Sequence, residues 1–324
     1  MTMNRRRLLA AACAALALPS VSRAQGDKPV IRILLGLPPG AGTDAIARVI
    51  ADRLPAQLGQ PVIVENKVGA GGRLAADAVA AAAPDGLTWM IAPNATPTFQ
   101  TLVFGHELKW NLWRDFAPVA GIASYPLGMA VATHTGASNV REFVAWVKQH
   151  PAASFGTPGL GGQNHFLGVQ FARSAGITLP VVPYKGTPPL IGDLVGGHVP
   201  AAVTLMDQII TFHRSGRVRV IGIFSDRRFE LMPDIPTMAE QGVDVPAGEG
   251  WTAMWAPAKT PPAAIARMED AVRKVLALPE VRETLTQRLS VLPHFLDAQA
   301  MAERQRKELA AWEPVIKASG FKPQ

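Results

Sequence analysis

The chain has a single cysteine, Cys13, among its 324 residues. Cys13 lies in an apolar N-terminal stretch that we expect to be removed, so the mature chain would have no disulfide, thiol nucleophile or cysteine metal ligand. Stability must then come from a large hydrophobic core, which a chain of this length most readily forms as two domains. Beyond the N-terminal stretch, no apolar run is long enough to cross a membrane.

Several catalytic signatures are also missing. The seven histidines show neither His-x-x-x-His nor His-Glu-x-x-His spacing, which disfavours a zinc hydrolase. There is no Gly-x-Ser-x-Gly elbow, and no Gly-Lys-Ser/Thr follows a glycine run, which excludes a P-loop. Lys and Arg form no stripe interleaved with aromatic residues, so nucleic acid is not an expected partner. We expect no catalytic residue, no metal and no cofactor.

The N-terminus has the three parts of an export signal. Arg5-Arg6-Arg7 is a basic start, Leu8 to Leu18 is an apolar run too short to span a bilayer, and Ser22-Arg23-Ala24 is a small-residue cleavage site. We expect residues 1–24 to be a signal peptide and the mature protein to work in the periplasm. Asn4 to Leu9 approximates the twin-arginine pattern, so both that route and ordinary secretion stay open. Cleavage removes four arginines and no acid, which lowers the formal charge from +7 to +3.

The remaining sequence alternates short apolar segments with amphipathic ones, which predicts α/β layers around mostly parallel sheets. We expect a first domain of residues 25–126 plus 253–324 and a second domain of residues 127–252. Crossovers near Pro126-Leu127 and Trp251-Thr252 would join the two domains and act as a hinge. The expected strands are 30–35, 61–65, 87–92, 127–133, about 154–156, 180–183, 201–206, 218–224 and 251–256. The expected helices are 46–54, 74–83, 140–149, one that ends near 174, 188–196, 208–215, one that begins at 261, and 298–318.

Three loops at expected strand ends are candidate ligand contacts: Pro38 to Asp44, Asn94-Ala95-Thr96, and Thr157 to His165. Glycine lets a backbone approach a ligand closely, and free N–H groups at helix starts attract anions. In open α/β sheets, ligands bind at this edge. Thr43 or Asp44 suits a helix N-cap. The alternative is that these loops are only tight turns.

Three further features allow more than one interpretation. Gly40-Ala41-Gly42-Thr43-Asp44-Ala45 fits a dinucleotide fingerprint, with Glu65 as the ribose-binding acid, but Pro38-Pro39 stiffens the turn before the first glycine. His165 could orient its glycine loop or be an ordinary hydrogen-bonded neighbour. Trp251 shares a strand face with Trp255, where core packing is the default and a pocket wall the alternative.

Taken in order, the segments resemble the substrate-binding receptors of tripartite tricarboxylate transporters, the Bug-type periplasmic proteins. The resemblance covers essentially the whole mature chain. It rests on Leu37 to Asp44, Val64 to Gly72, Ala83 to Gly86, Asp115 to Val119, Gly156 to Gly159 with His165, Pro183 to Gly186, Asp193 to Gly197 and Pro233 to Thr237.

The resemblance implies a two-domain periplasmic binding protein (type II, Venus flytrap) that holds a small carboxylate through backbone groups and ordered waters. Met206-Asp207-Gln208 would be a specificity position. Asp207 would meet the ammonium group of an amino acid, or cap the following helix if the ligand is a plain diacid. The expected contacts are Pro39, Gly40, Ala41, Gly42, Thr43, Asp44, Asn94, Thr96, Thr157, Pro158, Gly159, Gly161, Gly162, Gln163, His165, Asp207 and Trp251.

The predicted function is therefore that of a receptor, not an enzyme. We expect a monomer that captures a di- or tricarboxylate, an aromatic acid or an amino acid and presents it to membrane transporter subunits. Two alternatives stay open. One is a ligand-sensing partner of a signalling system, and the other is an exported dinucleotide-dependent oxidoreductase.

Overall fold

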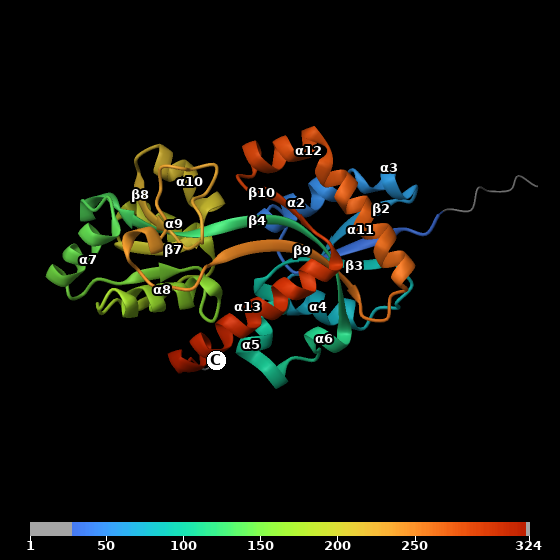
Figure 1. The fold of residues 1–324 in the computed structure, drawn as a ribbon, viewed down its shortest axis with the longest axis horizontal. Coiled ribbons are helices and arrows are strands. Elements are labelled where there is room, and N and C mark those ends of the chain that lie inside the picture. The colour runs from blue at the N-terminus through green and yellow to red at the C-terminus, as the bar shows by residue number, and fades with distance from the viewer. Residues whose placement is uncertain (1–27, 322–324) are drawn as a thin grey trace, which may run out of the picture.

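The computed structural model describes residues 28–321, so the expected signal peptide, Cys13 and the twin-arginine pattern lie outside the described residues. The fold is mixed α/β, with elements labelled as in Figure 1. The strands are β1 (Ile31–Leu35), β2 (Val62–Asn66), β3 (Thr88–Pro93), β4 (Phe116–Ala132), β5 (Phe155–Thr157), β6 (Val181–Pro183), β7 (Ala201–Leu205), β8 (Val218–Ile223), β9 (Glu249–Pro257) and β10 (Leu292–Leu296). The helices are α2 (Gly42–Ala51), α3 (Leu54–Leu58), α4 (Arg73–Ala80), α5 (Gln100–Phe104), α6 (Leu112–Asp115), α7 (Val140–Gln149), α8 (Gln163–Ser174), α9 (Thr187–Gly196), α10 (Met206–Arg214), α11 (Pro262–Ala277), α12 (Pro279–Glu283) and α13 (Ala298–Ser319).

The strands form one continuous sheet in the order β2-β1-β3-β9-β4-β7-β5-β6, with β8 and β10 also paired to β4. We call β1, β2, β3 and β10 with their helices the first lobe, and β5 to β8 with α7 to α10 the second lobe. Pairing is parallel between β1 and its neighbours and between β5 and its neighbours. Every pair that involves β4 or β9 is antiparallel. The expectation of mostly parallel sheets was therefore wrong for the centre of the molecule.

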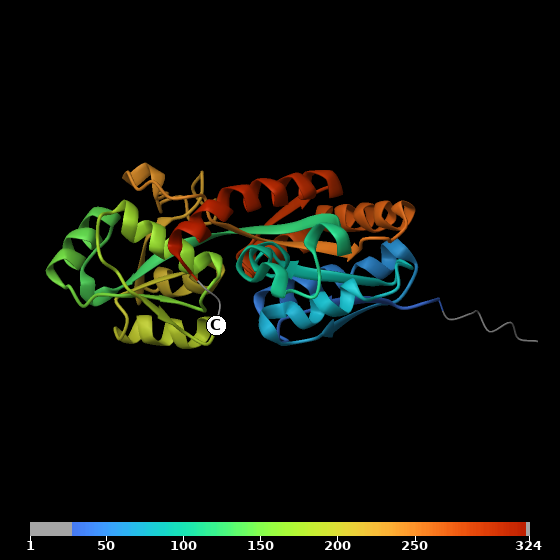
Figure 2. The same ribbon diagram turned by 90° about the horizontal axis from the view of Figure 1, so that it is seen from below.

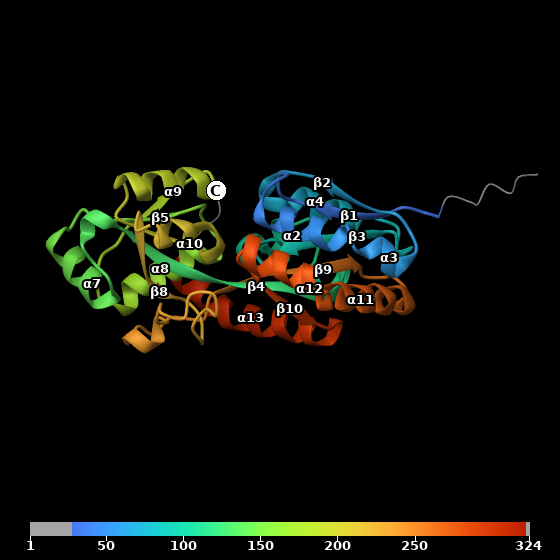
Figure 3. The same ribbon diagram turned by 90° about the horizontal axis from the view of Figure 1, so that it is seen from above.

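The long strand β4 joins the lobes. Its first part pairs with β9 and β10, and its last part with β7 and β8, so one strand belongs to both lobes. The register with β9 shifts between Pro118 and Ala120 and again between Gly121 and Ala123. Such irregularities accommodate residues that a regular ladder excludes, and proline is one of these. Figure 3 shows β4 passing between the lobes, with α13 on one side and α9 and α2 on the other.

The C-terminal helix is a further connection that the sequence did not indicate. Trp312 and Ile316 of α13 belong to the buried cluster that includes Phe143 and Phe155 of the second lobe. The Trp312 ring also packs edge-on against Phe99, with the centroids 5.2 Å apart. Figure 2 shows α13 running beside β4 from one lobe towards the other. The lobes are therefore linked by α13 as well as by the crossover strands.

Within residues 28–321, no helix has both the length and the apolar character needed to cross a membrane.

Candidate ligand-binding site

The first glycine loop connects β1 to α2 and is braced by Asp44. Ala41 is the N-cap of α2 and provides no side-chain cap, so neither Thr43 nor Asp44 caps the helix as expected. Asp44 is buried and accepts hydrogen bonds from Gly40 N at 2.9 Å, from Arg48 at 2.9 and 3.0 Å, and from Asn66 Nδ2 at 2.8 Å. Burial disfavours the charged form of Asp44, but these hydrogen bonds outweigh it and hold its pKa below the ordinary value. The loop keeps its shape while the first turn of α2 stays free of side-chain caps.

Asp207 of the second lobe lies against this loop. A Cβ added at Gly42 would be 3.3 Å from Asp207 Oδ2 and 3.7 Å from Gln208 Nε2. Asp207 Oδ2 accepts a 2.6 Å hydrogen bond from Gln208 Nε2, whereas the buried Oδ1 has no partner. Burial raises the pKa of Asp207 to about 6. The N-cap of α10 is Leu205, so Asp207 lies in the first turn and does not cap the helix as the diacid alternative supposed.

Tyr125 of β4 lies between the first glycine loop and β9, and the sequence analysis did not identify it as part of the site. Its hydroxyl lies 3.3 Å from Thr252 Oγ1 and also meets the Thr43 side chain. Burial, which is almost complete, raises the pKa of the Tyr125 phenol. Gly250 makes room for the ring, because a Cβ there would be 2.2 Å from Tyr125 Cε2. The sequence held one signal for Tyr125: it is one of only two tyrosines in the chain, and it lies beside an expected crossover.

The second glycine loop joins β5 to α8. Thr157 is fully buried and donates a 3.1 Å hydrogen bond to Gly159 O. His165 orients the loop as one alternative proposed, because Gly161 N donates to His165 Nδ1 at 3.3 Å. Burial lowers the pKa of His165, which favours the neutral imidazole that this acceptor role needs. Gly162 is the N-cap of α8 and offers no side-chain cap, so this helix start is also open.

Asn94 connects the second loop to β9 and α13. Its backbone N donates to Trp251 O at 2.8 Å, and its Nδ2 lies 3.5 Å from Gln163 Oε1 and 2.8 Å from Glu308 Oε1. The Gln163 Nε2 is buried and has no partner. Glu308 was not expected here. Burial raises its pKa to about 7 despite hydrogen bonds from Asn94 and Trp251.

The structure therefore brings the expected residues into two groups. Gly42 meets Asp207, while Asn94 meets Gln163 and Trp251. Thr43 of the first loop meets Tyr125, which also contacts Thr252. Trp251 and Thr252 are consecutive on β9, so their side chains point to opposite faces of the sheet. Thr96 lies slightly apart, with its Oγ1 3.4 Å from Gly71 O. Pro39 and Gly40 are exposed, whereas Ala41, Pro158, Gly159 and Gly162 are partly exposed.

The dinucleotide interpretation finds no support in the geometry. Glu65, the expected ribose-binding acid, forms two hydrogen bonds with Arg32 at 2.6 and 2.7 Å. Gly40 also does not follow β1 directly, because that strand ends at Leu35. Across residues 28–321, there is no group of three His, Cys, Asp or Glu side chains arranged to hold a metal ion.

Two lobes that share the long strand β4, with glycine loops from each lobe meeting residues of the other, define a two-domain binding protein of the periplasmic type. Residues 46–321 match the family model described as tripartite tricarboxylate transporter family receptor. The chain is 31% identical to protein BugT of Bordetella pertussis over 326 residues, which covers 99% of each chain. MatC of Rhodopseudomonas palustris, solved with bound malate, matches with a TM-score of 0.74 and 29% identity, over 89% of this chain and 98% of that one. A second R. palustris protein, solved with adipate, matches with a TM-score of 0.81 and 27% identity, over 91% and 98% of the two chains.

The chain belongs to the tripartite tricarboxylate transporter receptor family. This is a family of periplasmic solute-binding receptors, not of enzymes, so the receptor prediction and the two-domain flytrap fold are confirmed. The oxidoreductase alternative is wrong for this chain.

Proposed function

We propose that the protein is exported through the signal at residues 1–24 and binds a small organic carboxylate in the periplasm. It then presents this ligand to the membrane subunits of a tripartite tricarboxylate-type transporter. The contact residues are those of the two glycine loops, Asn94, Asp207 and their neighbours. Malate and adipate in the related structures support a carboxylate as the ligand.

The observation that carries the proposal is a pair of unsatisfied polar atoms beside the two open helix starts. Gln163 Nε2 and Asp207 Oδ1 are buried without a partner. A buried polar group without a hydrogen bond costs free energy, so such groups are expected where a ligand completes them. The amide suits a carboxylate oxygen, and a carboxyl with a pKa near 6 can donate to an anion or accept from a hydroxyl or ammonium group.

The charge of the loops agrees with this chemistry. Neither Pro38 to Asp44 nor Thr157 to Gln163 contains a lysine or arginine. Anion binding would therefore rely on backbone N–H groups at the starts of α2 and α8, together with the dipoles of these helices.

Capture would involve closure of residues 25–126 plus 253–324 onto residues 127–252, with β4 and β9 as the hinge. Gly42 and Asp207 come from opposite lobes, as do Asn94 and Gln163, so a ligand at these groups contacts both. A ligand that makes such contacts only in the closed form shifts the population towards it.

Calorimetry with a dicarboxylate and its diamide tests the proposal. The dicarboxylate should bind better, because the site offers donors for negative oxygens. Gly159→Pro should abolish binding but preserve the thermal unfolding transition, since it removes one N–H and stiffens the loop. Gly159→Ala is the matched control, because a Cβ there meets no atom within 4 Å. Equal affinity for the diacid and the diamide would refute anion recognition.

A further inference from the structure

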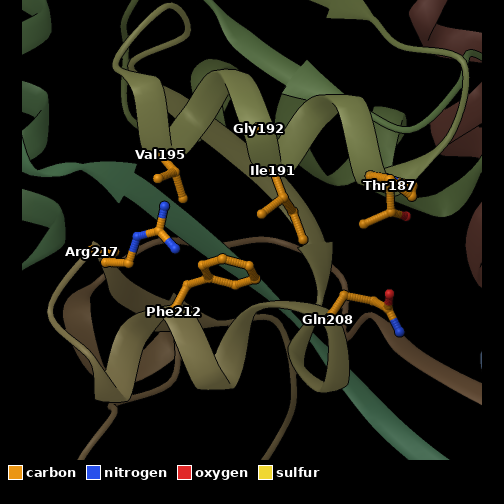
Figure 4. A pocket seen from close by; sticks show the side chains of 8 residues that line it. Thr187, Ile191, Gly192, Val195, Gln208, Phe212 and Arg217 are labelled. Carbon is orange, nitrogen blue, oxygen red and sulfur yellow. The ribbon is translucent and has the colours of Figure 1, made fainter.

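A groove separates α9 from α10 in the second lobe (Figure 4) and has a volume of about 420 Å³. Its walls are apolar: Ile191 and Val195 come from α9, and Phe212 comes from α10. Gly192 lies between the two α9 side chains and has no side chain of its own. A Cβ added there would meet no atom within 4 Å, so the space beside it is open. The groove can therefore accommodate an aliphatic chain.

One end of the groove lies at the candidate ligand-binding site. Both helices begin there, with Thr187 on one wall and Gln208 on the other. Gln208 holds the Asp207 carboxylate at 2.6 Å and lies close to Gly42 of the first loop. Gly186, immediately before α9, donates its N–H to Pro158 O of the second loop at 3.0 Å. The walls at this end are thus attached to both glycine loops.

The other end of the groove carries an exposed cation. Figure 4 shows Arg217 at the end opposite Thr187 and Gln208. The Arg217 guanidinium lies 5.4 Å from the centroid of the Phe212 ring. In the part of the chain that the structure describes, no carboxylate forms an ion pair with it. Arg214 and Arg219 add positive charge nearby in the chain.

We propose that the groove holds the aliphatic chain of a long α,ω-dicarboxylate, with one carboxylate at the glycine loops and the other at Arg217. From Thr187 to Val195, α9 rises roughly 12 Å, a span that suits a diacid of about ten carbons. The unpaired guanidinium favours a diacid over a fatty acid, because arginine binds carboxylates through charge-assisted hydrogen bonds. This inference rests on the proposed function and names a ligand class within it.

The test is calorimetry with butanedioate, hexanedioate, octanedioate, decanedioate and decanoate. For the unmodified protein, affinity should rise roughly twofold to fourfold with each methylene that enters the groove. Decanedioate should also bind more tightly than decanoate. Equal or weaker binding of decanedioate relative to butanedioate would overturn the groove assignment.

Three variants separate the groove from the loops. Gly192→Phe fills the groove and should weaken decanedioate binding at least about tenfold, while butanedioate binding stays within about twofold. Gly192→Ala leaves the groove open and should change neither affinity. Arg217→Gln should weaken decanedioate binding about tenfold but leave decanoate unaffected.

The outcomes distinguish the two proposals. If none of the acids binds, the proposed carboxylate function fails, and the groove assignment fails with it. If butanedioate binds but Gly192→Phe and Arg217→Gln leave decanedioate binding unchanged, the receptor function stands and the groove assignment is wrong. If Gly192→Phe weakens the binding of butanedioate and decanedioate equally, the groove assignment is also wrong, because the substitution would then act on the loops.

Discussion

Replacing Asp207 with asparagine should stabilise the ligand-free protein at alkaline pH and have a much smaller effect at acid pH. Burial raises the pKa of Asp207 from 3.8 to about 6, so the folded protein favours the protonated carboxyl. The stabilising effect of that proton is complete below a pH of about 4 and is lost as the pH rises through about 6. Above this pH, the buried charge costs up to about 3 kcal/mol. Because Asp207 keeps partial contact with solvent, we expect asparagine to recover about 1–3 kcal/mol.

Urea unfolding of the ligand-free protein near pH ~4.5 and pH ~8 measures this effect. Asp193→Asn is the matched control on α9. Hydrogen bonds from Tyr184 and His198 lower the pKa of Asp193, so its contribution has the opposite sign. It is present above the unfolded pKa and lost as the pH falls, and Asp193→Asn should therefore destabilise at alkaline pH. The reasoning about Asp207 would be refuted if Asp207→Asn had the same effect at both pH values, or if it destabilised at the higher one.

Three further experiments test other contacts. Gly250→Ala should lower the free energy of unfolding in urea by about 1–3 kcal/mol, because the added Cβ would collide with the Tyr125 ring. Gly192→Ala is the control, since its Cβ would lie in open space and should not destabilise the protein. Equal effects of the two substitutions would contradict the packing argument. In calorimetry, Asp207→Asn should weaken amino-acid binding about a hundredfold if Asp207 meets the ammonium group, but should change binding of a plain diacid little, because the asparagine amide can still donate a hydrogen bond to a carboxylate oxygen. A large loss with the diacid would show that Asp207 contacts more than a positive charge. In solution scattering, the radius of gyration should shrink when a verified ligand is added, and an unchanged radius at saturation would refute closure about β4 and β9.

The sequence predicted helices and strands well where the hydrophobic periodicity agrees with the residues that typically begin or end such an element. The helix expected at 140–149 is found at Val140–Gln149, where Asn139 accepts a hydrogen bond from Glu142 N and caps the helix. The first part of β4 was missed, because Pro118 and Pro126 interrupt it and prolines argue against a central strand. Its partners β9 and β10 are distant in sequence, so no local pattern indicates the antiparallel pairing.

The same distinction between local sequence patterns and long-range packing applies to the candidate site. The two glycine loops could be predicted because glycine, proline and the start of a helix are all local features. Tyr125 and Glu308 could not, because their roles depend on the packing of β4 and α13 against β9. The position of Asp207 was predicted, but its unpartnered oxygen and its contact with Gly42 depend on the fold.

Because α13 packs on both lobes, the C-terminal helix should resist separation of the lobes. Rotation of the lobes about β4 and β9 would slide or separate the contacts that Trp312 and Ile316 make with the buried cluster of the second lobe, so opening has an enthalpic cost that is set in part at α13. The apparent affinity of a receptor depends on the fraction of molecules that are competent to bind. Substitutions at Trp312 or Ile316 can therefore change how tightly the receptor holds its ligand, and how readily it releases it, without altering any atom that the ligand contacts.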